Sequence, residues 1–328
     1  MLTKTDFQQA RQMIATSLQP TPLQYSATFS RYTGHQVWVK PENLQKTGSF
    51  KFRGAANRMA HLTDAERGQG VITASSGNHG AAVAFAANRQ GIPATVVMPE
   101  GAPRSKVLAV RGYGADVVFY GHYPDERKEH ARALTSEQNL TYVDSNEDED
   151  IIAGQGTCAL EILKECPDVD VILAPIGGGG LVSGVAAAAH HLRPDVQVIG
   201  VEPCGAASMS ASLAAGEPTS VDVETIADGL RSRKPGPMTF AYCQQYVAKI
   251  HRVSEAQIAD AMVLALERLK LLLEPSGAVA LAGLLDGAVT GSDRRVAVVL
   301  SGGNVDLTRL MDIMQDHAPV FSRCDMRP

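Results

Sequence analysis

The sequence has no strong excess of either charge, and this absence excludes one class of partners. Its 30 lysine and arginine residues stand against 35 aspartate and glutamate residues, which gives a net charge of −5 and an isoelectric point near 6.0. A chain without a positive field over its surface has no general means of holding a polyanion. We therefore expect no nucleic-acid partner.

Closely spaced cysteines are also lacking. The chain has five cysteines, they are widely spaced with no C-x-x-C, and an odd number cannot all pair within one chain. This usage fits a reducing cytoplasm and offers no zinc cage, so we predict a cytoplasmic protein. The cysteines are Cys158, Cys166, Cys204, Cys243 and Cys324.

Long apolar runs are missing as well. The N-terminus carries Asp6, Gln8 and Gln9 where an export signal needs an unbroken apolar stretch. The most apolar stretch, Val171 to Ala189, is interrupted by Pro175 and by four glycines. We interpret it as a strand, a loop and a buried helix, and we expect no membrane partner.

What the sequence does contain is an alternation of short β-branched runs with helical patterns. The chain has 328 residues, of which 45% are hydrophobic and 20% charged, as in ordinary globular proteins. The alternation is typical of βαβ units and parallel sheets. The expected strands are 36–40, 70–75, 94–99, 115–120, 169–175, 196–202 and 295–301. The expected helices are 80–90, 104–111, 125–138, 152–164, 181–191 and 254–273, the last opened by a capping box of Ser254 and Gln257.

Two α/β lobes that close on a cleft fit this pattern best. We predict a large domain built from residues 1–69 and 148–328, and a small domain built from residues 70–147. The acidic segment Ser145 to Asp150 (SNEDED) lies at the second boundary. Because charge runs on connections are usually solvated, we interpret this segment as a surface connection without a functional role.

Three glycine-rich turns each follow an expected strand and open a helix. They are 75–80 (SSGNHG), 177–181 (GGGGL) and 301–304 (SGGN). Backbone N–H groups at such turns can converge on an anion. The strongest of the three contains Gly177, Gly178, Gly179 and Gly180, since glycines allow the main chain to approach a ligand closely. A phosphate is the natural ligand of this loop.

A dinucleotide is the alternative ligand for the four-glycine loop. The loop lies between two expected strands, and the second strand ends in Glu202, as in a Rossmann unit with its ribose-binding acid. The third glycine of the G-x-G-x-x-G pattern is, however, replaced by Ser183 or Val182, depending on the register. A nicotinamide-dependent oxidoreductase is therefore the weaker hypothesis.

A lysine earlier in the chain favours a different cofactor. Lys51 follows Ser49, the expected N-cap of a helix, and so would lie in the first helical turn. The helix dipole and partial burial both disfavour an ammonium ion there, and a neutral amine can attack a carbonyl carbon. Together with a phosphate loop, Lys51 indicates a cofactor with an aldehyde and a phosphate, and pyridoxal phosphate has both.

On these motifs the chain resembles the fold-type II pyridoxal-phosphate enzymes, in the branch of the threonine/serine ammonia-lyases (dehydratases) and serine racemases. The resemblance covers nearly the whole chain, and the motifs follow the order and spacing of that family. They are TPL (21–23), KPENLQKTGSFKFRGA (40–55), SSGNHG (75–80), IAGQGT (152–157), GGGGL (177–181), ETIADGL (224–230), EPSGA (274–278) and SGGNVDL (301–307). The resemblance implies an α/β fold of the tryptophan synthase β type. Two open, twisted, mostly parallel sheets are flanked by helices, and the cofactor lies in the cleft between the lobes.

The resemblance also implies a role for each matching residue of the cofactor site. Lys51 would form the Schiff base and later act as the general base, and Phe50 would pack on the pyridine ring. Asn78 would hydrogen-bond the ring hydroxyl, and Ser301 would face the pyridine nitrogen. The glycines 177–180 would bind the phosphate through their backbone N–H groups.

The substrate carboxylate would be held by the turn that contains Ser75, Ser76, Asn78 and His79. We expect His79 to contribute structure or its backbone, and not to act as a base. Ser76 lies where serine racemases carry a serine, so its hydroxyl could reprotonate Cα on the face opposite Lys51. The alternative is a hydroxyl that only caps the turn.

The expected reaction is β-elimination from L-threonine or L-serine, which gives a 2-oxo acid and ammonia. The neutral Ser301 would not hold a full pyridinium charge, which favours early loss of the β-substituent. The alternatives are a serine racemase, or a dehydratase for a bulkier or acidic hydroxy amino acid such as hydroxyaspartate, phenylserine or a hydroxyectoine-derived acid. Ala81, after the SSGNHG turn, leaves room for a larger substituent. A non-catalytic ligand-binding relative is a further hypothesis.

Racemases and hydroxyaspartate dehydratases of this branch also bind a divalent cation. Glu202 and the carbonyl of Ala206 match two of its ligands, but the second acidic position is Ser208. One carboxylate with a hydroxyl is a poor site for a hard cation, so we expect no divalent metal, while a monovalent cation is left open. The resemblance further implies a homodimer, and we expect no C-terminal regulatory domain.

Overall fold

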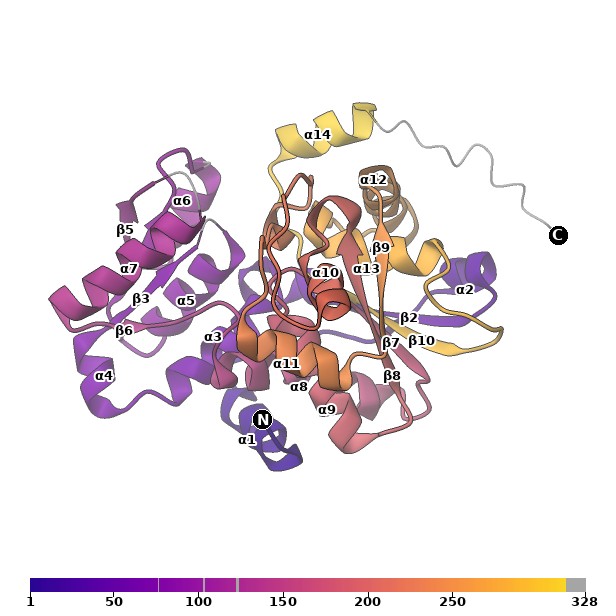
Figure 1. Ribbon diagram of the computed structural model, residues 1–328, viewed down its shortest axis with the longest axis horizontal. Coiled ribbons are helices and arrows are strands. Elements are labelled where there is room, and N and C mark those ends of the chain that lie inside the picture. The colour runs from indigo at the N-terminus through magenta and orange to yellow at the C-terminus, as the bar shows by residue number, and fades with distance from the viewer. Residues whose placement is uncertain (76, 103, 122–123, 317–328) are drawn as a thin grey trace.

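The computed structural model describes residues 1–75, 77–102, 104–121 and 124–316, and its strands form two separate sheets (Figure 1). The larger sheet has the strand order β1-β2-β10-β7-β8-β9, and the smaller has the order β5-β4-β3-β6. Each sheet is flanked by helices, and only β1 is antiparallel to its neighbour. The predicted α/β class with two mostly parallel sheets is confirmed.

The larger sheet takes its strands from both ends of the described chain. They are β1 (Gln24–Tyr25), β2 (Gln36–Pro41), β7 (Val171–Pro175), β8 (Gln197–Pro203), β9 (Lys249–Val253) and β10 (Arg295–Leu300). The last strand, β10, lies between β2 and β7, with Ala297 opposite both Trp38 and Ile172. Strands β7 and β10 are rich in Val, Ile, Leu and Ala because helices cover both faces of a parallel sheet.

The smaller sheet is formed by one continuous stretch of the chain. Its strands are β3 (Val71–Ala74), β4 (Ala94–Met98), β5 (Asp116–Phe119) and β6 (Thr141–Tyr142), all parallel. Ile72 in β3 pairs with Thr95 on one side and Tyr142 on the other. All four strands fall within residues 70–147, although the predicted domain boundaries themselves stay a prediction.

Helices cover both faces of each sheet. In the larger sheet, α12 and α13 pack on one face, and α8, α9 and α11 pack on the other. In the smaller sheet, α3, α5 and α6 lie on one face and α7 lies on the other. The helices are α1 (Lys4–Ile14), α2 (Ala27–Thr33), α3 (Lys51–Ala60), α4 (Asp64–Gln69), α5 (Asn78–Asn88), α6 (Arg104–Gly112), α7 (Pro124–Gln138), α8 (Glu149–Glu165), α9 (Gly180–Leu192), α10 (Ser208–Ala215), α11 (Pro237–Tyr246), α12 (Glu255–Leu264), α13 (Pro275–Leu285) and α14 (Leu307–Asp316).

The apolar stretch 171–189 is strand β7, the glycine loop and the buried helix α9, as predicted. None of the described helices combines the length and the apolar character needed to cross a membrane. The capping box of Ser254 and Gln257 at the start of α12 is confirmed. The predicted helix 254–273 is too long, because α12 gives way to a π-helical turn at Ala265–Leu269, and Lys270 then adopts a left-handed backbone (φ 61°).

Candidate active site

The predicted site residues lie beyond the carboxyl ends of parallel strands. Ser75 follows β3, Gly177 closely follows β7, and Ser301 follows β10. The carboxyl ends of strands are where open α/β sheets bind their ligands. A backbone hydrogen bond from Phe50 to Ser301 connects the turn after β10 with the start of α3.

Lys51 is the first residue of α3, and its amine has only uncharged partners. Its Nζ donates to the Ser145 carbonyl oxygen at 3.0 Å and to Asn146 Oδ1 at 3.3 Å. The Phe50 ring centroid lies 5.1 Å from Nζ. Burial lowers the pKa of Lys51 to about 8, although the Asp144 carboxylate acts in the opposite direction. Near neutral pH a much larger fraction of this amine than of an ordinary lysine is therefore in the neutral form that attacks carbonyl carbons.

The cap predicted for this helix is wrong. Phe50, and not Ser49, is the N-cap of α3, and no side chain caps the helix. Ser49 instead pairs through its backbone with Gly302, and its buried Oγ has no partner among the described residues. The antiparallel pairing of Ser49 with the turn after β10 holds the residue in an extended conformation.

The acidic segment 145–150 is part of this site, which contradicts its interpretation as a solvated connection. Asp148 caps α8 by accepting hydrogen bonds from the backbone N–H groups of Asp150 and Ile151. The Glu147 carboxylate accepts from the backbone of α11 and, at 2.7 Å, from Thr239 Oγ1. These contacts fix Asn146 beside Lys51. A charge run in a sequence does not reveal the contacts of Glu147, because its donors lie about 90 residues away along the chain.

The four-glycine loop connects β7 with α9 and lies against Asn146. Gly179 has a left-handed backbone (φ +94°), and a Cβ atom there would lie 2.9 Å from Thr239 Cβ. A Cβ atom on Gly178 would collide with the Asn146 amide. None of the hydrogen bonds between described residues uses the backbone N–H groups of Gly177–Gly180. The loop is thus a set of free donors at a helix N-terminus, which suits a phosphate.

Ser301 lies next to the Phe50–Lys51 segment. Its carbonyl oxygen accepts the Phe50 N–H at 3.0 Å, and its Oγ donates to the Ser276 carbonyl at 3.3 Å. The side chain is only 3% exposed. Its backbone thus contacts the residue before Lys51, while its role as the partner of a ring nitrogen stays a prediction.

Asn78, at the start of α5, is held by two side chains that the sequence analysis did not single out. Its Nδ2 donates to Glu274 Oε1 at 2.5 Å, and its Oδ1 accepts from Asn304 Nδ2 at 2.8 Å. Burial and the nearby Asp228 carboxylate raise the pKa of Glu274 to about 8. Both partners belong to motifs on which the resemblance rests, EPSGA (274–278) and SGGN (301–304). Membership of these motifs was the only feature of the sequence that could have pointed to them.

The predicted carboxylate turn also contains Ser75 and His79, which have few polar contacts. Ser75 Oγ accepts the Gly77 N–H at 3.2 Å. His79 is buried with Nε2 3.3 Å from the Val143 carbonyl oxygen, and burial lowers its pKa to about 3. The imidazole is therefore neutral, which supports a structural role. Ser76 lies outside the described residues.

The residues matched to a cation site are engaged with α10. Glu202 accepts hydrogen bonds from the Met209 N–H at 2.8 Å and from both the N–H and the hydroxyl of Ser210. Ala206 is buried, and the buried Ser208 Oγ has no partner within the described part of the chain. Glu202 thus caps a helix. The ribose-binding acid that the dinucleotide hypothesis requires is therefore already hydrogen-bonded inside the protein.

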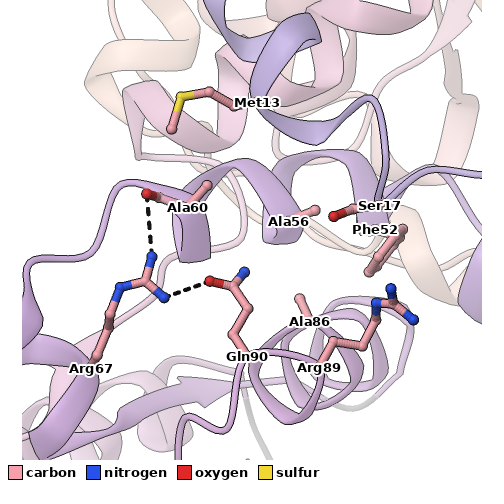
Figure 2. Close-up of a pocket in the computed structure, with 9 residues that line it drawn as sticks. All are labelled: Met13, Ser17, Phe52, Ala56, Ala60, Arg67, Ala86, Arg89 and Gln90. Atoms are coloured by element: carbon pink, nitrogen blue, oxygen red, sulfur yellow. Dashed lines mark hydrogen bonds between the residues drawn. The ribbon is translucent and has the colours of Figure 1, made fainter.

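Two hollows open on the surface near these elements. One, of about 220 Å³, is lined by Asn78, Lys106 and Asn304 and borders the site. The other, of about 240 Å³, lies among α1, α3 and α5 (Figure 2). There Arg67 donates to the carbonyls of Met59 and Leu62, so its charge serves to cap the end of α3. None of the predicted site residues lines the second hollow.

The comparisons with known proteins agree with this geometry. A sequence profile of the family described as pyridoxal-phosphate dependent enzyme matches residues 14–302. An L-threonine ammonia-lyase of Thermotoga maritima is 43% identical over 311 residues, which are 94% of this chain and 77% of the relative. An L-threo-3-hydroxyaspartate ammonia-lyase of a Pseudomonas species is 39% identical over 296 residues, which are 90% of this chain and 93% of the relative.

The fold comparison gives the same result. The solved structure of maize serine racemase has a TM-score of 0.91 and 37% sequence identity, and the match covers 96% of this chain and 97% of the racemase. A threonine deaminase of Solanum lycopersicum has a TM-score of 0.89 and 36% identity, over 95% of this chain and 93% of that structure. The resemblance stated from the sequence motifs is confirmed.

Proposed function

Because the chain belongs to the pyridoxal-phosphate dependent enzyme family, we propose that it catalyses β-elimination from L-threonine and L-serine, with a 2-oxo acid and ammonia as products. The observation that carries the proposal is the placement of Lys51. Its amine has a lowered pKa and no charged partner among the described ion pairs. It also donates a hydrogen bond to Asn146, which lies against the glycine loop. The threonine ammonia-lyase relatives support this choice of reaction.

The residues of the site fit pyridoxal phosphate. The free N–H groups of Gly177–Gly180 would hold its phosphate, Phe50 would pack on its ring, and Ser301 would face the ring nitrogen. Asn78 has a second Nδ2 hydrogen for the ring hydroxyl. When bound, the cofactor withdraws electrons from the substrate Cα, so that its proton can be removed.

The protein's own contribution begins with the Lys51 amine. The Ser145 carbonyl and Asn146 Oδ1 accept two of its hydrogens, which directs the nitrogen lone pair away from both groups. With a pKa of about 8, Nζ can take the Cα proton and later release it near neutral pH. The Lys51 amine thus serves first as a nucleophile and then as a base.

The first turn of α5 would bind the substrate carboxylate. The backbone N–H groups of Asn78 and His79 lie at a helix N-terminus, where a negative charge is stabilised. The neutral His79 ring, hydrogen-bonded at the Val143 carbonyl, adds no competing charge. The carboxylate would thus be held by the part of the molecule that carries the smaller sheet.

Serine racemisation is a second candidate, because the fold is closely similar to that of maize serine racemase. Elimination from L-threo-3-hydroxyaspartate is a third, in view of the Pseudomonas relative. Both use the same lysine and the same phosphate loop. The homodimer and the cytoplasmic location implied by the sequence stay predictions.

The proposal is tested by the visible absorption spectrum of the purified protein, recorded before and after addition of L-threonine or L-serine, with the 2-oxo acid assayed in the same sample. We expect the band of a lysine-bound cofactor, its change on addition of substrate, and formation of 2-oxo acid. Lys51→Ala should lack both the band and the product. Chiral analysis of residual serine and a parallel assay with L-threo-3-hydroxyaspartate separate the three candidates. A wild-type protein that stays colourless with pyridoxal phosphate would overturn the proposal.

A further inference from the structure

Asn78, Glu274 and Asn304 form a chain of hydrogen bonds between turns that are far apart in the sequence. Asn304 Nδ2 donates to the backbone carbonyl of Thr47 at 2.7 Å and to Asn78 Oδ1 at 2.8 Å. Asn78 Nδ2 then donates to Glu274 Oε1 at 2.5 Å. The chain connects the segment before Lys51 with the first residue of α5 and with the residue before α13.

This chain determines which way round the Asn78 amide lies. An asparagine side chain has two N–H donors on one atom and an acceptor on the other. The Asn304 amide nitrogen is donor-only, so Asn78 must present its Oδ1 to it. A reversed Asn78 would place two amide nitrogens against each other and lose the donor to Glu274. One Nδ2 hydrogen of Asn78 is left unused by these contacts.

The surrounding backbone is shaped for the two partner side chains. A Cβ atom on Gly48, which has a left-handed backbone (φ +74°), would collide with Asn304 Oδ1. A Cβ atom on Gly302 would collide with Glu274 Oε1. Both partners are therefore packed into spaces that any residue larger than glycine would fill. Glu274 is also buried, so its position is restricted by packing, whereas the exposed Asn304 is held by its hydrogen bonds to Thr47 and Asn78.

The protonation of Glu274 agrees with this arrangement. Burial and the Asp228 carboxylate raise its pKa to about 8, while the hydrogen bond from Asn78 and the Lys106 ammonium act in the opposite direction. Lys106 is itself paired with Asp228 at 2.6 Å. Near neutral pH, Glu274 is thus a neutral acceptor that a glutamine can imitate.

We propose that Glu274 and Asn304 are positioning residues that fix the Asn78 amide so that its spare Nδ2 hydrogen is available to the ring hydroxyl of the cofactor. The inference rests on the proposed function only for the identity of that cofactor. Neither residue is required to touch the substrate. Their effect on the reaction passes through one hydrogen bond of Asn78.

The test uses Asn304→Asp, which keeps the size of the side chain but exchanges its donor for an acceptor. The variant should turn the Asn78 amide round and remove its hydrogen bond to the ring hydroxyl. We expect pyridoxal phosphate to bind the apoprotein about 10-fold to 100-fold more weakly, the range for loss of one strong hydrogen bond. The visible band of the bound cofactor should also shift. Unchanged affinity and an unchanged band in a folded Asn304→Asp protein would overturn the proposal.

Glu274 provides a second pair of variants in case Asn304→Asp does not fold. Glu274→Met keeps the length of the side chain without an acceptor and should weaken binding about tenfold. Glu274→Gln restores the acceptor and should recover most of that loss. Equal affinities of the Met and Gln variants would contradict the inference, and the unfolding midpoint of each apoprotein shows whether the fold is intact.

The two proposals fail in different ways. A wild-type protein that binds pyridoxal phosphate but forms no 2-oxo acid refutes the proposed reaction and leaves the positioning role standing if the variants bind as expected. A wild-type protein that turns over threonine, with variants that bind the cofactor normally, refutes the positioning role alone. A wild-type protein that binds no pyridoxal phosphate refutes both.

Discussion

Two cations on the first turn of α3 have opposite surroundings. Arg53 is fully buried and forms a two-pronged pair with Glu42, with both distances 2.7 Å, and a second pair with Glu161. Lys40 pairs with the same Glu161 at 2.6 Å, so two positive charges face two negative ones. Although burial alone would lower it, these carboxylates raise the pKa of Arg53 well above its ordinary value.

Lys51, two residues earlier, takes part in none of the ion pairs between described residues. Its acceptors are a carbonyl and an amide, so burial prevails and its pKa falls. The comparison shows that burial by itself does not decide what a cation does. A carboxylate partner makes it a structural element, and a neutral partner leaves it reactive.

The largest effect is expected for Arg53→Met, which tests whether Arg53 has a structural role. It leaves the completely buried Glu42 without its cationic partner, while Glu161 keeps its pair with Lys40. We expect the free energy of unfolding in urea to fall by about 3–5 kcal/mol, the cost of removing one member of a buried pair. Lys51→Met is the matched control on the same helix and should leave stability unchanged or raise it while abolishing turnover. Equal stability losses for the two variants would mean that the surroundings of the two cations do not differ as described.

A second prediction compares a glycine of the four-glycine loop with a glycine elsewhere in the chain. Gly179 and Gly216 both have left-handed backbones, but a Cβ atom on Gly216 meets nothing within 4 Å. Each alanine variant should lose roughly 1–2 kcal/mol of stability from backbone strain. Gly179→Ala should lose more, and it alone should bind pyridoxal phosphate weakly, which a titration of the apoprotein measures. If both variants bind the cofactor equally, the loop does not hold the phosphate.

The smallest expected effect is the pH dependence of cofactor capture. Only the neutral amine of Lys51 reacts, so the rate at which the apoprotein forms the Schiff base should rise about tenfold between pH 7 and 9 and then level off, because its pKa is about 8. Stopped-flow absorbance at constant ionic strength measures this rate. Asp144→Asn removes a charge that raises the pKa of Lys51, and it should move the midpoint below 8. A rate that keeps rising to pH 10 would show that the amine is not buried as described.

Much of the fold could be predicted because most of its strands are short runs rich in β-branched residues. All seven expected strands are present, since such runs have few alternatives. Strand β9 was missed because its KIHRV pattern is mostly polar at the edge of the sheet. The end of α12 was missed because the apolar run continues through Leu273, while Lys270 turns the backbone away from the helix.

The site was predictable where backbone chemistry requires a residue type. The glycines beside Asn146 and the lysine at the start of a helix carry such signals. The roles of Asn146, Glu147 and Glu274 were not predictable, because their partners lie about 90 to 200 residues away along the chain. Ordinary polar residues gain such roles only through tertiary contacts.

The central position of β10 has a consequence for how the chain folds as it is synthesised. The smaller sheet needs only residues 71–142 and can form early. Strands β2 and β7 have no neighbour on their facing edges until residues 295–300 have been synthesised. Only then can β10 insert between them. The same insertion brings Ser301 against Phe50. The segment that contains Lys51 therefore gains its contact with Ser301 only after β10 has inserted.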